Sequence, residues 1–193
     1  MNHAPSITKE EISTLPIEAF TGKIVVIDKI TDLEKAIEYI SLQQCVGFDT
    51  ETRPNFSKKQ HHKVSLIQIS SEETCYLFRL NKLGGIPASL INFFNDKQVM
   101  KVGLSLLDDF SAIRKLVQIE PANFIDLQKF VPAFGIEDAS LQKIYAILFG
   151  KKISKKTRLS NWETEELSEV QLRYAALDAW ACLRIYQHLI RLQ

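Results

Sequence analysis

Three groups of acidic residues and one tyrosine stand out because together they could hold metal ions. The residues concerned are Asp49, Glu51, Asp108, Asp109, Tyr174 and Asp178. Hard divalent cations prefer carboxylate oxygens, and several carboxylates are needed to offset the charge of two dications. Two such ions about 3.5–4 Å apart stabilise the attacking and leaving oxygens of an in-line displacement. The combination predicts a site that holds two divalent metals and cuts phosphodiester bonds.

The first group lies in a segment expected to be a strand. Asp49 and Glu51 are two residues apart at the end of the apolar stretch 45–50, and alternate side chains of a strand point to the same face. Metal coordination explains two carboxylates on one face of an apolar strand. The alternative is a strand end that emerges into solvent, which would be the better explanation for a lone pair of this kind.

The second group opens a helix expected over residues 108–117. Acidic side chains in a first turn are favoured by the helix dipole, so capping is a sound alternative for one of the two. We expect Asp108 to cap the helix and Asp109 to face the metals, although helical spacing alone leaves this assignment open.

The third group combines a phenol with a carboxylate. Tyr174 and Asp178 are four residues apart in a helical segment, so they share one helix face. A tyrosine beside a metal-binding carboxylate can orient the attacking water or help to remove its proton. The alternative is a ring that packs in the core. Several neighbouring alanines predict a slim helix that can approach a sheet closely.

The remaining pattern predicts an α/β fold with a mixed sheet flanked by helices. Strands are expected at residues 23–28, 45–50, 64–69, 74–78, 99–102 and 124–127. Helices are expected at 31–42, after Pro87, at 108–117, after 127, at 140–148 and from about 168 onward. We divide the chain into a lead-in with one short helix, 1–22, and one domain, 23–193.

Composition is that of an ordinary globular protein. Of 193 residues, 46% are hydrophobic and 24% charged, and the formal net charge is +1. This near-zero net charge gives no evidence for nucleic-acid binding and does not exclude it. The three cysteines have no metal-ligand spacing, which argues against a zinc site or a disulfide framework. No signal peptide or membrane-spanning stretch is recognised, so we expect a cytoplasmic protein without a membrane partner.

Three segments resemble the motifs of a known enzyme superfamily. Phe48–Glu51, Val102–Asp109 and Tyr174–Asp178 resemble the three motifs of the DEDD exonucleases, and the tyrosine is typical of the DEDDy branch. Val64–Gln68 and Ser160–Trp162 add to the likeness. Each motif alone is weak, but the ordered set is specific. It covers nearly all of residues 23–193 and is similar to the ribonuclease D group, to Werner-type exonucleases in particular.

The resemblance implies a ribonuclease H-like fold with a five-stranded mixed sheet. It implies a 3′-5′ exonuclease that releases nucleoside 5′-monophosphates with two Mg²⁺ or Mn²⁺ ions and no organic cofactor. Asp49, Glu51 and Asp178 would bind the first metal, with Asp49 bridging to the second. Asp109 would act at the second metal through waters, and Tyr174 would position the nucleophilic water. Thr52–Phe56 departs from the Trp-Pro-Pro of Werner-type relatives, which leaves the shape of the substrate entrance open.

A basic loop precedes the last motif. Its candidate nucleic-acid contacts are Lys151, Lys152, Lys155, Lys156, Arg158 and Trp162. The alternatives are a solvated loop for the basic residues and a packing anchor for the tryptophan. Lys58 and Lys59 are further candidates for the phosphate path.

The substrate is expected to be a nucleic acid, either a single strand or the 3′ end of a duplex. The pattern does not distinguish DNA from RNA and names no protein partner. Two other functions remain open: a nucleic-acid-binding domain without catalysis, and a two-metal hydrolase of short oligonucleotides.

Overall fold

A six-stranded mixed sheet forms the centre of the molecule. The computed structural model describes residues 3–57 and 61–192 of the chain. The strands are β1 (Lys23–Ile27), β2 (Cys45–Thr52), β3 (Val64–Ser70), β4 (Thr74–Arg79), β5 (Met100–Gly103) and β6 (Phe124–Asp126). They lie in the order β1-β4-β3-β2-β5-β6.

The sheet topology confirms the predicted mixed sheet and corrects its size. β3 runs antiparallel to both neighbours, β2 and β4, while the other pairs are parallel. The sheet has six strands instead of the five implied by the resemblance. The two edge strands, β1 and β6, were both among the six strands expected from the sequence pattern, and β6 pairs with β5 from Lys101↔Phe124 to Gly103↔Asp126.

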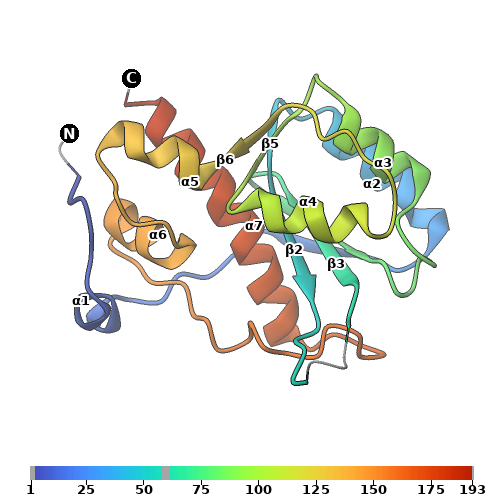
Figure 1. Ribbon diagram of the computed structural model, residues 1–193, viewed down its shortest axis with the longest axis horizontal. Coiled ribbons are helices and arrows are strands. Elements are labelled where there is room, and N and C mark those ends of the chain that lie inside the picture. Colours follow the sequence, from blue (N-terminus) through green and yellow to red (C-terminus); the bar gives the residue numbers. More distant parts are fainter. Residues whose placement is uncertain (1–2, 58–60, 193) are drawn as a thin grey trace.

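Helices cover both faces of this sheet (Figure 1). They are α1 (Lys9–Thr14), α2 (Ile30–Ser41), α3 (Ala88–Asn95), α4 (Leu106–Arg114), α5 (Leu127–Phe130), the 3₁₀ helix η1 (Val131–Phe134), α6 (Leu141–Phe149) and α7 (Glu169–Ile190). The long helix α7 crosses one face, with α5 and α6 beside it, while α2, α3 and α4 cover the other face.

Alternation along β2 separates a hydrophobic face from the acidic one. Phe48 is fully buried on the face covered by α2, α3 and α4, where its ring lies edge-on to Phe94 and Phe124. Asp49 and Glu51 therefore point to the other face, toward α7. The packing of Phe48 fixes the register of β2, since a shift by one residue would bury the carboxylates in the hydrophobic core.

Close contact between α7 and β2 depends on Gly47. A Cβ atom at this position would lie 1.8 Å from the carbonyl oxygen of Ala179. The glycine and the small α7 side chains therefore allow the helix backbone to approach the strand directly. Because Asp178 precedes Ala179, this contact also sets the distance between Asp178 and the carboxylates of β2.

Replacing Gly47 with alanine is expected to push α7 away from β2. Overpacking of this kind costs about 1–3 kcal/mol of unfolding free energy, and a backbone contact has little freedom to relax. Urea denaturation should show the loss of stability, and nuclease activity should fall with it. A Gly47→Ala variant with wild-type stability would contradict this account of the helix–strand contact.

The lead-in lies along the segment that connects η1 with α7. Glu137 donates its backbone N–H to the Pro5 carbonyl at 2.8 Å, and Glu18 donates its own to the Lys152 carbonyl at 2.9 Å. Within the described ranges, no helix combines the length and apolar character needed to cross a membrane.

Candidate active site

Three of the predicted carboxylates come together under α7. Asp49 and Glu51 extend from β2 and Asp178 from α7, and one ligand oxygen of each lies within 4.8 Å of the others. These three residues line a cleft of about 410 Å³, and Tyr174 and Gln128 also line it. Strand alternation and the i,i+4 helix spacing thus place the side chains as the sequence predicted.

Asp109 joins this group through the residue between the two β2 carboxylates. The hydroxyl of Thr50 donates a hydrogen bond to Asp109 Oδ1. The first turn of α4 is thereby held against β2 beside the cluster. Asp108 is exposed, and only its neighbour faces the site, as expected from the motif.

The expectation that Asp108 caps α4 is wrong. Asp126 has this role: its carboxylate accepts from the backbone N–H groups of Ser105 at 2.9 Å and Leu106 at 3.1 Å. Pairing of β5 with β6 brings Asp126 opposite Gly103, next to the start of the helix. Ser105 has a left-handed backbone, φ 60°, so Asp126 stabilises a strained turn that places Asp109.

Burial raises the pKa values of all four carboxyl groups, and the charges of neighbouring acidic residues add to the shift at Asp49, Glu51 and Asp109. The pKa of Glu51 is raised to about 9, by burial first and then by the charges of Asp178 and Asp109. Burial likewise raises the pKa of Asp178 to about 7 and that of Asp109 to about 6. The pKa of Asp49 also lies well above its ordinary value, because it is buried and surrounded by the other three.

These residues fit a hard divalent cation. Repulsion among close, buried carboxylates destabilises their ionised forms, and a bound dication removes this repulsion. Among the described side chains, Asp178 Oδ1 is buried and has no hydrogen-bond partner. An oxygen atom in this state is a suitable metal ligand, since buried polar atoms are otherwise hydrogen-bonded.

Tyr174 lies beside the cluster with its ring supported from behind. Its side chain lines the cleft, and Trp162, which is 1% exposed, packs against it with ring centroids 6.1 Å apart. The tryptophan ring therefore has the position of the packing anchor that the sequence left as an alternative to base stacking. Burial and then the charge of Asp178 raise the pKa of the Tyr174 phenol, so it stays protonated.

The basic loop divides into two parts with different surroundings. Lys155 and Arg158 are exposed and line the cleft, and their charges lower the pKa values of Asp178 and Glu51, respectively. Lys156 is exposed as well. These three residues are accessible to phosphate groups, and their contact with nucleic acid stays a prediction.

The other two lysines of the loop bind the lead-in. Lys151 forms an ion pair at 3.1 Å with Glu18, a buried carboxylate that also accepts from the Tyr145 hydroxyl at 2.7 Å. Lys152 donates to the carbonyl of Ser13. Lys58 and Lys59, the further candidates for the phosphate path, lie outside the described residues.

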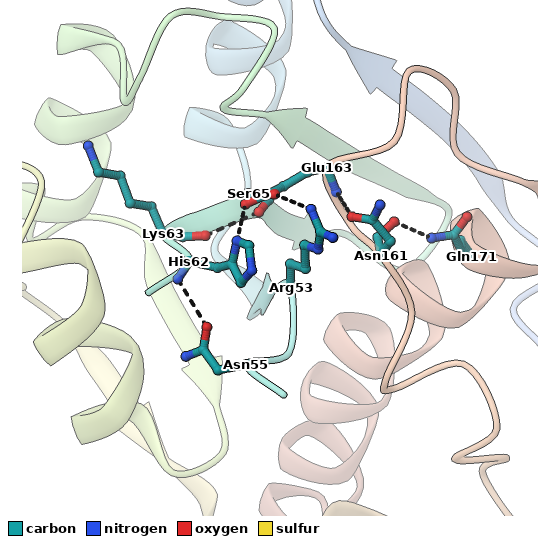
Figure 2. A network of polar contacts seen from close by, with 8 residues as sticks. All are labelled: Arg53, Asn55, His62, Lys63, Ser65, Asn161, Glu163 and Gln171. Atoms are coloured by element: carbon teal, nitrogen blue, oxygen red, sulfur yellow. Dashed lines mark hydrogen bonds and ion pairs between the residues drawn. The ribbon is translucent and has the colours of Figure 1, made fainter. Parts of the chain in front are cut away.

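A polar network joins the loop after β2 to the segment before α7 (Figure 2). Glu163 contacts Arg53 at 3.2 Å through one carboxylate oxygen and His62 at 3.1 Å through the other. The side chain of Asn161 accepts from the Glu163 backbone, and Gln171 donates to the Asn161 carbonyl. The network ties the exit of the strand that carries Glu51 to the start of the helix that carries Tyr174.

Sequence reasoning missed the residues that support the site. Thr50 and Asp126 orient α4, Arg79 donates to the carbonyls of Thr164 and Glu165, and Glu163 joins two loops. Arg79 is 3% exposed although it is the last residue of β4, and a basic residue at the end of an apolar strand gives no signal that it is buried.

Comparison with known proteins decides the family. The family model described as "3'-5' exonuclease" matches residues 24–192. The chain belongs to the 3′-5′ exonuclease family. This confirms the resemblance to DEDDy exonucleases of the ribonuclease D type, and the match spans every segment that carries a site residue.

Relatives of this exonuclease family include longer proteins. The chain is 32% identical over 187 residues to the mouse (Mus musculus) protein named "Bifunctional 3'-5' exonuclease/ATP-dependent helicase WRN", which covers 91% of this chain and 13% of that protein. It is 33% identical over 149 residues to Drosophila melanogaster "Exonuclease 3'-5' domain-containing protein 2", covering 76% of this chain and 25% of that protein. The chain thus spans a quarter or less of the length of these two relatives.

Solved structures of exonuclease domains share the fold. The Aedes aegypti Nibbler EXO domain superposes with a TM-score of 0.77 at 24% identity, covering 91% of this chain and 94% of that one. Escherichia coli RNase D superposes with a TM-score of 0.77 at 21% identity, covering 88% of this chain and 44% of that one. The ribonuclease H-like arrangement expected from the sequence is confirmed.

Proposed function

We propose that the chain is a metal-dependent 3′-5′ exonuclease that hydrolyses nucleic-acid phosphodiesters and releases nucleoside 5′-monophosphates. The observation that carries the proposal is the cluster of Asp49, Glu51 and Asp178, with one buried carboxylate oxygen unpaired, at the base of an open cleft. Family membership supplies the direction of cleavage. Because all four carboxylates and the tyrosine are present, an inactive binding domain is the weaker alternative.

The four carboxylates would hold two divalent ions, Mg²⁺ or Mn²⁺. Asp49, Glu51 and Asp178 would bind one ion. Asp49 would also contact the second ion, and Asp109 would bind that ion through water molecules. Ions held there lower the pKa of a water molecule and stabilise charge on phosphate oxygens. Asp178 and Glu51 accept the ions only when ionised, and Lys155 and Arg158 favour that ionised state.

Residues that line the cleft would position the substrate. Lys155 and Arg158 line the cleft and are exposed, so they can contact phosphate groups, whereas Lys151 forms an ion pair with Glu18. We infer that Tyr174 orients the attacking water through its hydroxyl group and does not act as a phenolate base. Of the two roles considered for the tyrosine, its raised pKa favours orientation.

Replacing Tyr174 with phenylalanine is expected to lower kcat by about 10²-fold or more, because the water loses its orienting hydroxyl. Mn²⁺ binding should remain, since the carboxylates are unchanged and the ring still packs against Trp162. Single-turnover cleavage and Mn²⁺ titration would check the two parts. A variant with wild-type kcat would rule out this role for the hydroxyl.

Structures in the same fold class support a nucleic-acid substrate. Trypanosoma brucei RNase D, 20% identical with a TM-score of 0.76, is described in complex with RNA U12. Brucella melitensis NrnC, 20% identical with a TM-score of 0.70, is described as bound to pGG. The first ligand is a strand and the second a dinucleotide, so substrate length is the property to test.

A gel time course provides that test. Single strands and recessed-3′ duplexes, as DNA and as RNA with a 5′ label, are incubated with Mg²⁺, Mn²⁺ or EDTA beside a labelled dinucleotide. We expect a metal-dependent ladder that shortens from the 3′ end. Cleavage of the dinucleotide alone would instead indicate an oligonucleotide hydrolase, and binding without cleavage would indicate an inactive domain.

A further inference from the structure

Gln68 on β3 has an unusual environment. It is fully buried, and neither polar atom of its side-chain amide has a hydrogen-bond partner among the residues described. Buried side-chain amides in folded proteins are nearly always paired. Ser70, also fully buried on the same face of β3, follows that rule and donates to the Ser71 carbonyl at 2.8 Å. We therefore expect the Gln68 amide to form a hydrogen bond with a group that is bound at the site.

The strand register places Gln68 beside the metal site. Gln68 pairs directly with Asp49 in the antiparallel ladder of β2 and β3, so both side chains point to the face under α7, with Cβ atoms about 4.5–5.5 Å apart. On its other side Gln68 pairs with Leu77 of β4, whose side chain has no polar atom. Asp178, from the helix that covers this face, also carries a buried oxygen, Oδ1, without a hydrogen-bond partner among the described residues.

We propose that Gln68 is a positioning residue: its amide nitrogen donates a hydrogen bond to the Asp49 carboxylate, directly or through one water, in the metal-loaded protein. Hydrogen bonds of this outer layer orient metal ligands, and their loss lowers metal affinity by about 10–100-fold. Asp49 depends on such a bond most, because it would contact both ions. The proposal rests on the metal site of the proposed function.

The test compares metal affinity with stability in the absence of metal. Gln68→Met has a similar volume and no amide. We expect Mn²⁺ affinity, measured by calorimetric titration, to fall about 10-fold or more. The melting temperature in EDTA should stay the same or rise, because an unpaired buried amide has been removed. A residue that only filled space would show the reverse: a lower melting temperature and unchanged Mn²⁺ affinity.

Two controls separate the amide from packing and from burial. Leu77→Met changes packing in the same layer, and Ser70→Ala removes a buried polar group farther along the strand; both should bind Mn²⁺ like the wild type. If Gln68→Met does not fold, Gln68→Asn withdraws the amide by one methylene and should also weaken binding. Wild-type Mn²⁺ affinity in the folded Gln68 variant overturns the proposal, whereas a wild-type protein that binds no Mn²⁺ overturns the metal site itself.

Discussion

Replacing Asp178 with asparagine is expected to abolish cleavage, by a factor on the order of 10³ or more, because a ligand to the first metal loses its charge. The same change should raise the melting temperature of the metal-free protein. Asp178 is one of the charges that raise the pKa of Glu51 and Asp49, so its removal relieves repulsion. Relief of about 1 kcal/mol corresponds to roughly 2–4 °C for a protein of this size.

Asp108 offers a matched control for this experiment. Asp108→Asn removes one carboxylate charge from an exposed position next to Asp109, and the variant should retain wild-type cleavage. Asp109→Asn should be inactive because its side chain faces the cluster. Activity in Asp109→Asn together with inactivity in Asp108→Asn would show that the second-motif carboxylate has been assigned to the wrong residue.

Metal binding is expected to stabilise the protein more strongly as pH rises. The pKa values of Asp109, Asp178 and Glu51 are raised to about 6, 7 and 9. Groups with raised folded-state pKa values stabilise the fold at low pH, and this contribution is lost as pH rises through those values. Because a bound cation requires the ionised forms, the difference in melting temperature between Mn²⁺-loaded and EDTA-treated protein should grow from pH 6 to pH 8.5.

Thermal melts across this pH range check the prediction, with Asp178→Asn as the control that should show little metal-induced shift. Treatment with EDTA should also stop cleavage at every pH. A metal-induced shift of constant size between pH 6 and pH 8.5 would mean that binding does not draw on carboxyl groups with raised pKa values.

Local spacing predicted the parts of the site that belong to one element. Asp49 and Glu51 share a face because strands alternate, and Tyr174 and Asp178 share a face because helices repeat every 3.6 residues. The structure also contains two capping boxes, which are local in the same way: Thr8 caps α1 and Ser168 caps α7. The ends of helices were predicted less well: the helix expected at 108–117 begins at Leu106 and ends at Arg114.

Contacts between distant segments were beyond the reach of spacing. Thr50 and Asp109 meet because β2 pairs with β5, the strand that precedes α4, and Asp126 reaches the start of α4 because β6 pairs with β5. The division of the basic loop also depends on tertiary structure, since Lys151 faces Glu18 of the lead-in. The requirement for glycine at position 47 is also a tertiary effect, because only the contact with α7 leaves no room for a side chain there.

Diffraction from crystals grown with Mn²⁺ would test the central claim most directly. The account predicts an anomalous peak bound by carboxylate oxygens of Asp49, Glu51 and Asp178, which already lie within 4.8 Å of one another. A second peak is expected between Asp49 and Asp109 when a nucleotide is also present. Well-ordered crystals with Mn²⁺ at other positions and none at this cluster would contradict the assignment of the site and the mechanism built on it.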